Sequence, residues 1–291
     1  MYATTFEFDG IKSEDVGFYI LNFDGFSNDG VGVAGNEITF NISKPPNSKK
    51  WTFHGSKYET QLTIKFQIGK INCQNNKCSK LSSGECDFLL RWLVRSDGYK
   101  FLRIYQNEFE DTYFNAKINL QWIRLAGEII GAELEVICDA PFGYSAMKSY
   151  EVICADGDSF QIYNDSDEVG ATLFDEVNIL MTSDAKKLQI KNDMDTLYSP
   201  LVEYTTVINN LKQGENIIIA NRQIATNQSS HNITDDFNLR YPRLIYLSSS
   251  TAYNQNNNYP TYQENRINTY TVTGGSCHLL FNYRTTKKVL P

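Results

Sequence analysis

The sequence of 291 residues lacks the features that define several common classes of protein. Its 7 prolines and 6 cysteines do not suggest a proline-rich linker or a small disulfide-stabilised scaffold. No apolar run approaches the ~20 residues of a membrane-spanning helix. The first ten residues have neither the basic nor the apolar region of a secretory signal peptide. We therefore expect a protein made in the cytoplasm whose cysteines are reduced thiols.

Positive charge is also in short supply. The chain has 27 Lys and Arg against 34 Asp and Glu, a formal net charge of −7. This balance argues against nucleic-acid binding driven by bulk electrostatics. With 41% hydrophobic residues, the chain is long enough for roughly two domains with buried cores, which excludes disorder as its main state.

The residues that are abundant favour β-structure. Aromatic residues make up 13% of the chain, and alternation of apolar and polar residues dominates its first half. Three segments show this alternation over long stretches: 58–68, 114–122 and 130–138. Each has one apolar and one polar face, as an antiparallel sheet requires, and the first would reach ~35 Å as a single strand.

Residues 82–96 break the alternation. Their apolar residues recur at helical spacing: Phe88, Leu89, Trp92 and Leu93. Ser82 and Glu85 fit a capping box, and Gly98 suits the position just beyond the helix end. The pattern predicts one helix that lies across the sheet.

The alternation stops around residues 141–150, where we place a domain boundary. The predicted domains are 1–145 and 146–291. Short strands in the second half are spaced as in a β-sandwich. The second half is also electrically polarised, because residues 151–203 carry −9 and residues 204–291 carry +4.

A glycine-rich segment matches the spacing of a dinucleotide-binding fingerprint. It contains Gly30, Gly32 and Gly35. The fingerprint requires a helix N-terminus after it to hold the pyrophosphate, whereas residues 36–42 read as a strand. We interpret the segment as a flexible connection between strands and expect no cofactor.

Residues 165–176 match most positions of an EF-hand calcium loop. Val169 occupies the fifth position, where an oxygen ligand is needed, and the flanking residues alternate like strands. We interpret this segment as a solvated acidic turn, with a weak calcium site of another type as the alternative.

Three cysteines are clustered: Cys73, Cys78 and Cys86. A structural zinc site needs four ligands, and His54 would have to approach from elsewhere in the fold. We expect three free thiols and no metal site, with a structural metal as the alternative.

The sequence has no recognisable catalytic constellation. It contains neither a nucleophile elbow, nor a P-loop, nor a zinc-protease helix motif. Three histidines lie in unrelated contexts: His54, His231 and His278. Three acidic residues cluster at a turn that we interpret as a solvated face: Glu108, Glu110 and Asp111. We expect no catalytic residues and no enzymatic activity.

Aromatic residues are the candidates for interaction. Trp51 follows the lysine- and proline-rich segment 44–50, where a protruding arm would fit between two strands. It could anchor a neighbouring subunit or cap a core. The loop at 248–263 offers three tyrosines that could stack on a sugar or cover a subunit joint: Tyr253, Tyr259 and Tyr262.

Several segments resemble the distal tail proteins of long-tailed bacteriophages. The opening segment, 6–20, reads FEFDGIKSEDVGFYI, and the helix contains LRWL. Other N-terminal matches are the Gly35–Asn36 turn, the strand from Tyr58, YKFL at 99–102 and AELEVICDAP at 132–141. In the second half, the matches are LKQGENI at 211–217, DFNLRYPRL at 236–244 and NTYTVTG at 268–274.

The resemblance implies a mainly β fold with two parts. The N-terminal antiparallel domain would have one helix and a protruding hairpin, and the C-terminal domain would be a galectin-like β-sandwich. It further implies a hexameric ring at the virion tail tip, with DNA passing through its lumen without specific binding. The implied partners are the tail tube, tape measure, hub and receptor-binding proteins. Residues 72–80 depart from the family pattern.

Two other functions remain open at this point. The second domain could be a carbohydrate-binding sandwich that recognises host-surface glycan through the tyrosines of the late loop. A tail-associated glycan hydrolase rests only on the acidic turns. Long strands that reach beyond one domain favour pairing between subunits over either alternative.

Overall fold

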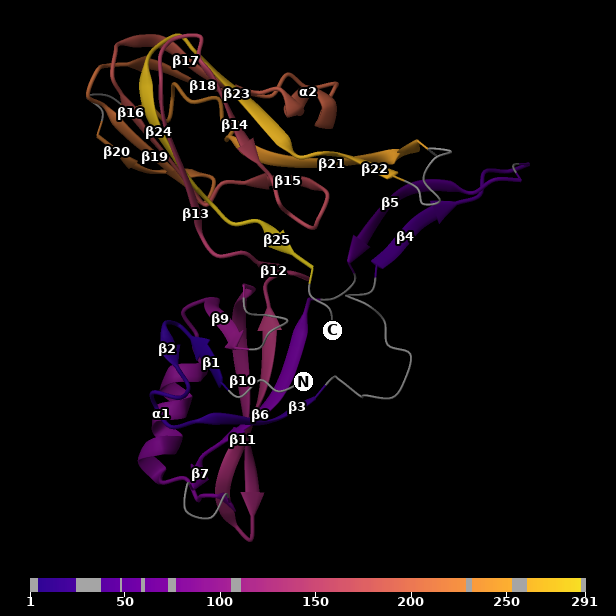
Figure 1. Cartoon of the computed structure of the whole chain (residues 1–291), viewed down its shortest axis with the longest axis vertical. Helices are drawn as coiled ribbons and strands as arrows, with labels where there is room; N and C mark the ends of the chain where they lie inside the picture. Colours follow the sequence, from indigo (N-terminus) through magenta and orange to yellow (C-terminus); the bar gives the residue numbers. More distant parts are fainter. Residues whose placement is uncertain are drawn as a thin grey trace. The chain divides into compact units, whose positions relative to one another are not determined.

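The computed structural model describes residues 5–24, 38–47, 49–58, 61–72, 77–105, 111–228, 232–252 and 261–288. These form two compact units, residues 1–145 with 287–291 and residues 146–286 (Figure 1). No described helix is long and apolar enough to cross a membrane. Both units are built mainly from antiparallel strands, which confirms the predicted fold class.

Unit 1 is built on one large antiparallel sheet. The strand order is β2-β1-β9-β10-β11-β6-β3, and β12 pairs with β10. The strands are β1 (Thr5–Phe8), β2 (Ile11–Lys12), β3 (Tyr19–Asp24), β6 (Thr63–Gly69), β9 (Lys100–Tyr105), β10 (Tyr113–Leu125), β11 (Glu128–Cys138) and β12 (Gly143–Tyr144). A short hairpin, β7 (Ile71–Asn72) and β8 (Lys77–Cys78), follows β6.

Two of the long predicted strands are confirmed as β10 and β11. They pair along almost their whole length, and Leu134 faces Leu120 on one side and Phe66 of β6 on the other. Their connecting turn, Ala126 and Gly127, has φ angles of 51° and 86°, as a two-residue turn between twisted strands requires. The apolar face of this sheet is the core of unit 1.

The predicted helix is α1 (Ser83–Leu93), and its capping box is present. Trp92 stacks on Phe6 of β1 at 5.5 Å between ring centroids. Its indole Nε1 donates a hydrogen bond to the carbonyl of Phe8 at 2.9 Å. The helix therefore covers one face of the sheet, as the spacing of its apolar residues predicts. It ends at Leu93, three residues before the end of the predicted stretch, because Val94 adopts an extended conformation.

The expectation of one continuous strand over 58–68 is wrong. β5 (Thr52–Tyr58) ends where that strand should begin, and it pairs with β4 (Ile38–Ser43) in a separate two-stranded sheet. β6 starts at Thr63 and pairs with β11 and β3 in the main sheet. The chain changes sheets between these two strands, while the alternation of residues continues through the change.

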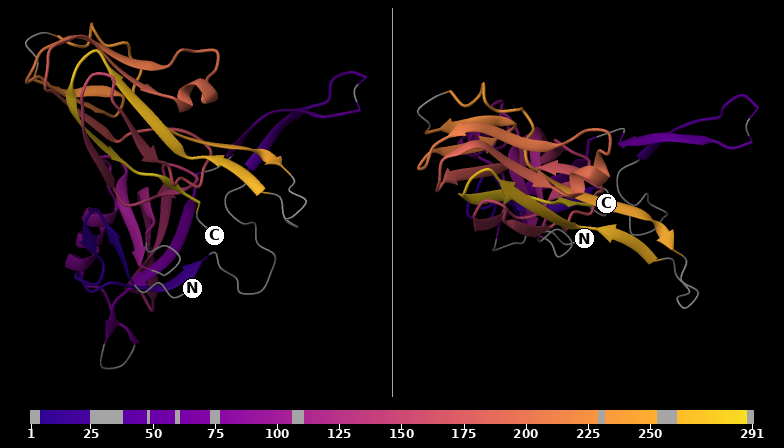
Figure 2. Two further views of the ribbon diagram at one scale, coloured as in Figure 1. Left: turned by 45° about the horizontal axis from the view of Figure 1, so that its top comes forward. Right: turned by 90° about the horizontal axis from the view of Figure 1, so that it is seen from above.

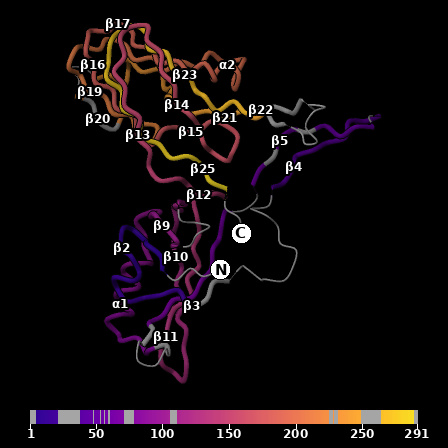
Figure 3. Tube along the Cα trace, in the orientation of Figure 1, coloured from indigo at the N-terminus to yellow at the C-terminus, as the bar shows by residue number. Residues whose placement is uncertain are grey.

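Unit 2 is a β-sandwich, as predicted. A five-stranded sheet has the order β13-β24-β16-β19-β20, and a four-stranded sheet has the order β14-β23-β17-β18. Figure 3 traces the chain through both sheets. Their strands are β13 (Lys148–Cys154), β14 (Ser159–Tyr163), β16 (Glu176–Met181), β17 (Ala185–Asn192), β18 (Thr205–Leu211), β19 (Asn216–Ala220), β20 (Gln223–Asn227), β23 (Ile267–Thr273) and β24 (Cys277–Tyr283).

The core of unit 2 lies between these sheets and is centred on aromatic rings. Phe160 of β14 contacts Tyr270 of β23 at 5.3 Å and Phe281 of β24 at 5.6 Å. The remaining elements of unit 2 are β15 (Gly170–Leu173), β21 (Arg243–Ala252), β22 (Thr261–Asn265) and the short helix α2 (Met194–Tyr198). The last strand, β25 (Thr286–Lys287), pairs with β12 of the large sheet.

The predicted loop at 248–263 is partly strand. β21 extends to Ala252, and its residues Ser248 and Ser249 pair with Glu264 and Gln263 of β22. The polar composition of this stretch suggested a loop, but polar residues also form strands when they pair in a hairpin. Residues 253–260 lie outside the part of the chain that the structure describes.

Candidate interaction sites

The β4–β5 hairpin carries exposed apolar side chains. Among the described strands, β4 and β5 pair only with each other (Figure 2). Phe40 is 61% exposed and Ile42 is 50% exposed. Trp51, which directly precedes β5, is 64% exposed and belongs to neither core. Exposed apolar residues are typical of surfaces that contact another molecule, so the hairpin is a candidate interaction surface.

The late-loop tyrosines lie mostly outside the described residues. Tyr253 and Tyr259 fall in the undescribed segment, and for Tyr262 the structure gives only its place in β22. Their stacking on a sugar or on a subunit therefore stays a prediction.

The candidate metal segments do not come together in the described structure. Cys73 lies outside the described residues, Cys78 is placed only as part of β8, and Cys86 is half-buried in α1. Burial raises the pKa of the Cys86 thiol. Within the described ranges, no group of three or more His, Cys, Asp or Glu residues could hold a metal ion.

The segment resembling a calcium loop is divided between strands. Residues 165–169 lie outside any strand, whereas Gly170, the sixth position, begins β15 and Glu176, the twelfth, begins β16. The carboxylate of Asp165 is bound by the ammonium group of Lys148 at 2.5 Å. The segments on either side form strands β14 and β16, as their alternation of apolar and polar residues predicted.

The histidines and acidic turn residues do not assemble a reactive centre among the described residues. His278 of β24 contacts Glu151 of β13, with Nε2 2.7 Å from Oε1. His54 lies in the β4–β5 hairpin, with Nε2 2.5 Å from the hydroxyl of Ser43. The other candidates, His231, Glu108 and Glu110, lie outside the described residues, and Asp111 is exposed.

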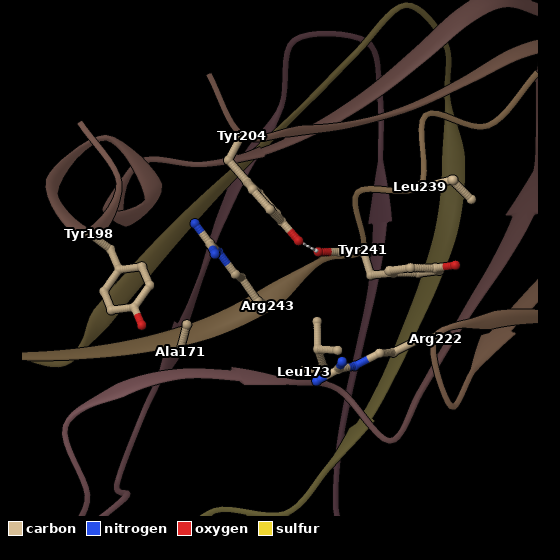
Figure 4. A pocket seen from close by; sticks show the side chains of 8 residues that line it. All are labelled: Ala171, Leu173, Tyr198, Tyr204, Arg222, Leu239, Tyr241 and Arg243. Atoms are coloured by element: carbon tan, nitrogen blue, oxygen red, sulfur yellow. Dashed lines mark hydrogen bonds between the residues drawn. The ribbon is translucent and has the colours of Figure 1, made fainter. Parts of the chain in front are cut away.

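A tyrosine–arginine cavity in unit 2 is a site that the sequence did not reveal. It has a volume of about 360 Å³ (Figure 4). Eight residues line it: Ala171, Leu173, Tyr198, Tyr204, Arg222, Leu239, Tyr241 and Arg243. They come from β15, α2, the segment before β18, the β19–β20 turn, the segment 239–241 and β21. Only the folded topology brings these six segments together.

Arg243 organises one wall of this cavity. Its Nε donates to Oδ1 of Asp195 at 2.5 Å, and its Nη2 donates to the Ser199 hydroxyl at 3.2 Å. The guanidinium carbon lies 3.6 Å from the ring centroid of Tyr204 and 5.1 Å from that of Tyr198. Figure 4 shows Arg243 reaching between these two rings.

The surroundings of Arg243 are buried and fixed. Its side chain is 13% exposed, and that of Asp195 is 6% exposed. Burial raises the pKa of the Asp195 carboxyl, and the hydrogen bond and charge of Arg243 partly offset that rise. Burial likewise raises the pKa of Tyr204, whose hydroxyl donates to the carbonyl of Tyr241 at 3.0 Å. The hydrogen bonds from Arg243 to Asp195 and Ser199 hold the guanidinium group in one orientation.

Comparison with known proteins assigns the family. A family model described as a phage tail protein N-terminal domain matches residues 1–140, and one described as a phage tail C-terminal domain matches residues 142–283. The chain therefore belongs to the phage tail proteins, and it is a structural component of the virion tail. No curated protein matches the chain.

A solved structure shares the fold over both units. The crystal structure of the Dit protein of phage SPP1 superposes on this chain with a TM-score of 0.58, and the two sequences are 10% identical. The match covers 97% of this chain and 99% of that one. Dit is described as a paradigm of the hub adsorption apparatus in phages that infect Gram-positive bacteria. The family matches confirm a phage tail protein, and the fold resembles that of a distal tail protein, as expected from the sequence.

Proposed function

We propose that this protein forms a hexameric ring at the tail tip that connects the tail tube to the hub and the receptor-binding apparatus. The family match over both halves of the chain supports a role in the tail, and the fold shared with Dit supports a distal position. The observation that carries the ring is the exposed apolar hairpin, because it is favourable for a neighbouring copy to cover exposed apolar side chains such as Ile42 and Trp51. A role in assembly, with no catalytic residues, follows from the same proposal.

The hairpin supplies the contact between neighbouring copies in this proposal. Residues 1–145 form the ring and residues 146–291 form the sandwich domain. Trp51 and Phe40 are the apolar anchors that a neighbouring copy covers. A contact repeated head to tail closes into a ring when its rotation angle divides the circle. The tail tube and tape measure proteins then join the faces of the ring.

Solution mass and imaging test the ring. Six chains of 33.2 kDa would weigh about 200 kDa. Native mass spectrometry of the full chain, alone and mixed with the tail tube protein, should show this mass, and particle images should show sixfold symmetry. Isolated tails in which the protein is present as a single copy would contradict the proposal.

A specific observation favours carbohydrate binding as a second candidate function, at the tyrosine–arginine cavity of unit 2 and not at the late loop. Its predicted residues, Tyr253, Tyr259 and Tyr262, have no described side chains. The tyrosine–arginine cavity, in contrast, has the aromatic surfaces and convergent polar groups that ligand sites use.

A further inference from the structure

We propose that the tyrosine–arginine cavity binds a saccharide or polyol unit that carries a phosphate or a carboxylate group. The proposal does not depend on the hexameric ring, because all the residues of the cavity lie in unit 2 of a single chain.

The charge of the cavity is the first argument. Its lining contains two arginines and no acidic residue, in a chain whose net charge is −7. Arg222 has no hydrogen bond or ion pair to any residue that the structure describes. Asp195 neutralises the charge of Arg243 but not that of Arg222, so the cavity keeps a positive charge that an anionic ligand can neutralise.

The backbone at the cavity is the second argument. Asn221 and Arg222 form the β19–β20 turn with φ angles of 51° and 58°. Glycine is the residue that such a turn prefers at its second position, and an arginine there is strained. Leu239, another lining residue, also has a positive φ of 57°. The turn therefore carries an arginine where glycine would be less strained, and this arginine lines the cavity.

The third argument is the pre-organised donor on Arg243. Asp195 and Ser199 hold Nε and Nη2, while Nη1 has no hydrogen bond to a described residue. In Figure 4, Arg222 lies beside Leu173 across the cavity from Tyr204. A guanidinium that is already fixed loses little freedom on binding an oxyanion, and its planar donors match phosphate and carboxylate geometry.

The remaining surface of the cavity suits a sugar or polyol. Ala171 and Leu173 provide an aliphatic wall, against which the C–H face of such a unit can pack. The hydroxyls of Tyr198 and Tyr241 donate no hydrogen bond to a described residue and are available to ligand hydroxyls. The volume of about 360 Å³ lies within the range of ligand sites and exceeds what a bare oxyanion fills.

Binding of small probes to the full chain tests the proposal. Glucose 6-phosphate and glucuronate represent the phosphate and carboxylate forms, and glucose and inorganic phosphate are the controls. Ligand-observed NMR and calorimetry should show that at least one acidic sugar binds, at least tenfold more tightly than either control. The two acidic probes distinguish which anion the cavity prefers.

A variant pair locates the site. Arg222→Gly should weaken acidic-sugar binding at least tenfold without lowering the melting temperature, because glycine suits this turn. Lys186→Gln removes one positive charge from an exposed position on β17 that does not line the cavity, and it should leave binding unchanged.

Four results would overturn the proposal. The first is that neither acidic sugar binds. The second is that inorganic phosphate binds as tightly as glucose 6-phosphate, which would indicate an adventitious ion only. The third is equal weakening by the two variants. The fourth is tighter binding of an acidic peptide, such as a tetraglutamate, than of either acidic sugar, which would assign the cavity to a protein partner.

Discussion

The main sheet of unit 1 and the β4–β5 hairpin differ in what covers their apolar faces. In the main sheet, Phe6, Phe66 and Leu134 are fully buried under α1 and neighbouring strands. In the β4–β5 hairpin, Phe40 and Ile42 alternate with polar residues in the same way but are at least half exposed. The same alternation of residues therefore builds a buried core in one sheet and an exposed apolar face in the other, which we propose to be an interface. Substitutions should separate these two roles.

The largest loss of stability should come from Trp92 in the main sheet. Trp92→Ala removes the stacking on Phe6 and leaves the carbonyl of Phe8 without its indole donor. We expect the free energy of unfolding of unit 1 to fall by about 3–5 kcal/mol. Chemical denaturation of the full chain, followed by a probe specific to unit 1, measures this. A loss below about 1 kcal/mol would mean that the helix is not part of the core.

Gly131→Ala should have the next largest effect. A Cβ at this position would lie 2.4 Å from the carbonyl oxygen of Ile68 on the neighbouring strand β6. The backbone must shift to relieve that contact, and we expect about 1–3 kcal/mol of destabilisation. Gly127→Ala, in the β10–β11 turn with open space around it but a φ of 86°, is a matched comparison for strain without a clash. Equal losses in the two variants would show that packing between β11 and β6 is looser than described.

The helix cap makes a smaller contribution that depends on pH. The Lys70 ammonium group, and then the backbone amide of Ser82, lower the pKa of Glu85 to about 2 from a usual 4.5. The lowered pKa means that the folded state binds fewer protons than the unfolded state. The stabilisation is therefore complete above pH 4.5 and is lost as the pH falls toward 2.

Ser82→Ala and Glu85→Gln measure this cap. Ser82→Ala should cost about 1 kcal/mol at neutral pH. Glu85→Gln should lower the free energy of unfolding by about 1 kcal/mol at pH 7, because solvent screens the partly exposed pair of Glu85 and Lys70. This difference from the wild type should shrink by pH 2.5. A difference that does not change with pH would contradict the role of the carboxylate.

The smallest effect on stability should come from the hairpin. Phe40→Ser should change the free energy of unfolding by less than about 0.5 kcal/mol, because the side chain is mostly exposed. It should nevertheless weaken association between copies. Thr39→Ser, on the other face of β4, is the matched control and should leave association unchanged. A Phe40→Ser protein that is as unstable as Trp92→Ala would place the hairpin in the core.

Sequence analysis correctly predicted those elements whose residue pattern fits only one type of secondary structure. β10, β11 and α1 combine long periodic patterns with local turn or capping signals, and the structure confirms them. The pattern over 58–68 failed because alternation shows which side chains share a face and does not show which sheet a strand joins. The chain passes from β5 to β6 without any change in that alternation.

The tyrosine–arginine cavity escaped sequence analysis for a different reason. Tyr198, Arg222 and Arg243 are separated along the chain and come from an α-helix, a turn and a strand start. None of them belongs to a motif of fixed spacing. One signal was available, since Asn221 is followed by Arg222 where a tight turn between strands favours glycine. Its significance becomes clear only when the topology places that turn beside Arg243.

Cross-linking in assembled tails tests the central claim most directly. A photoreactive phenylalanine analogue at position 40 should form links to a second copy of this chain, and the linked products should include species of up to six copies. Links only within one chain, or only to other tail proteins, would contradict an assembly held together by the β4–β5 hairpin.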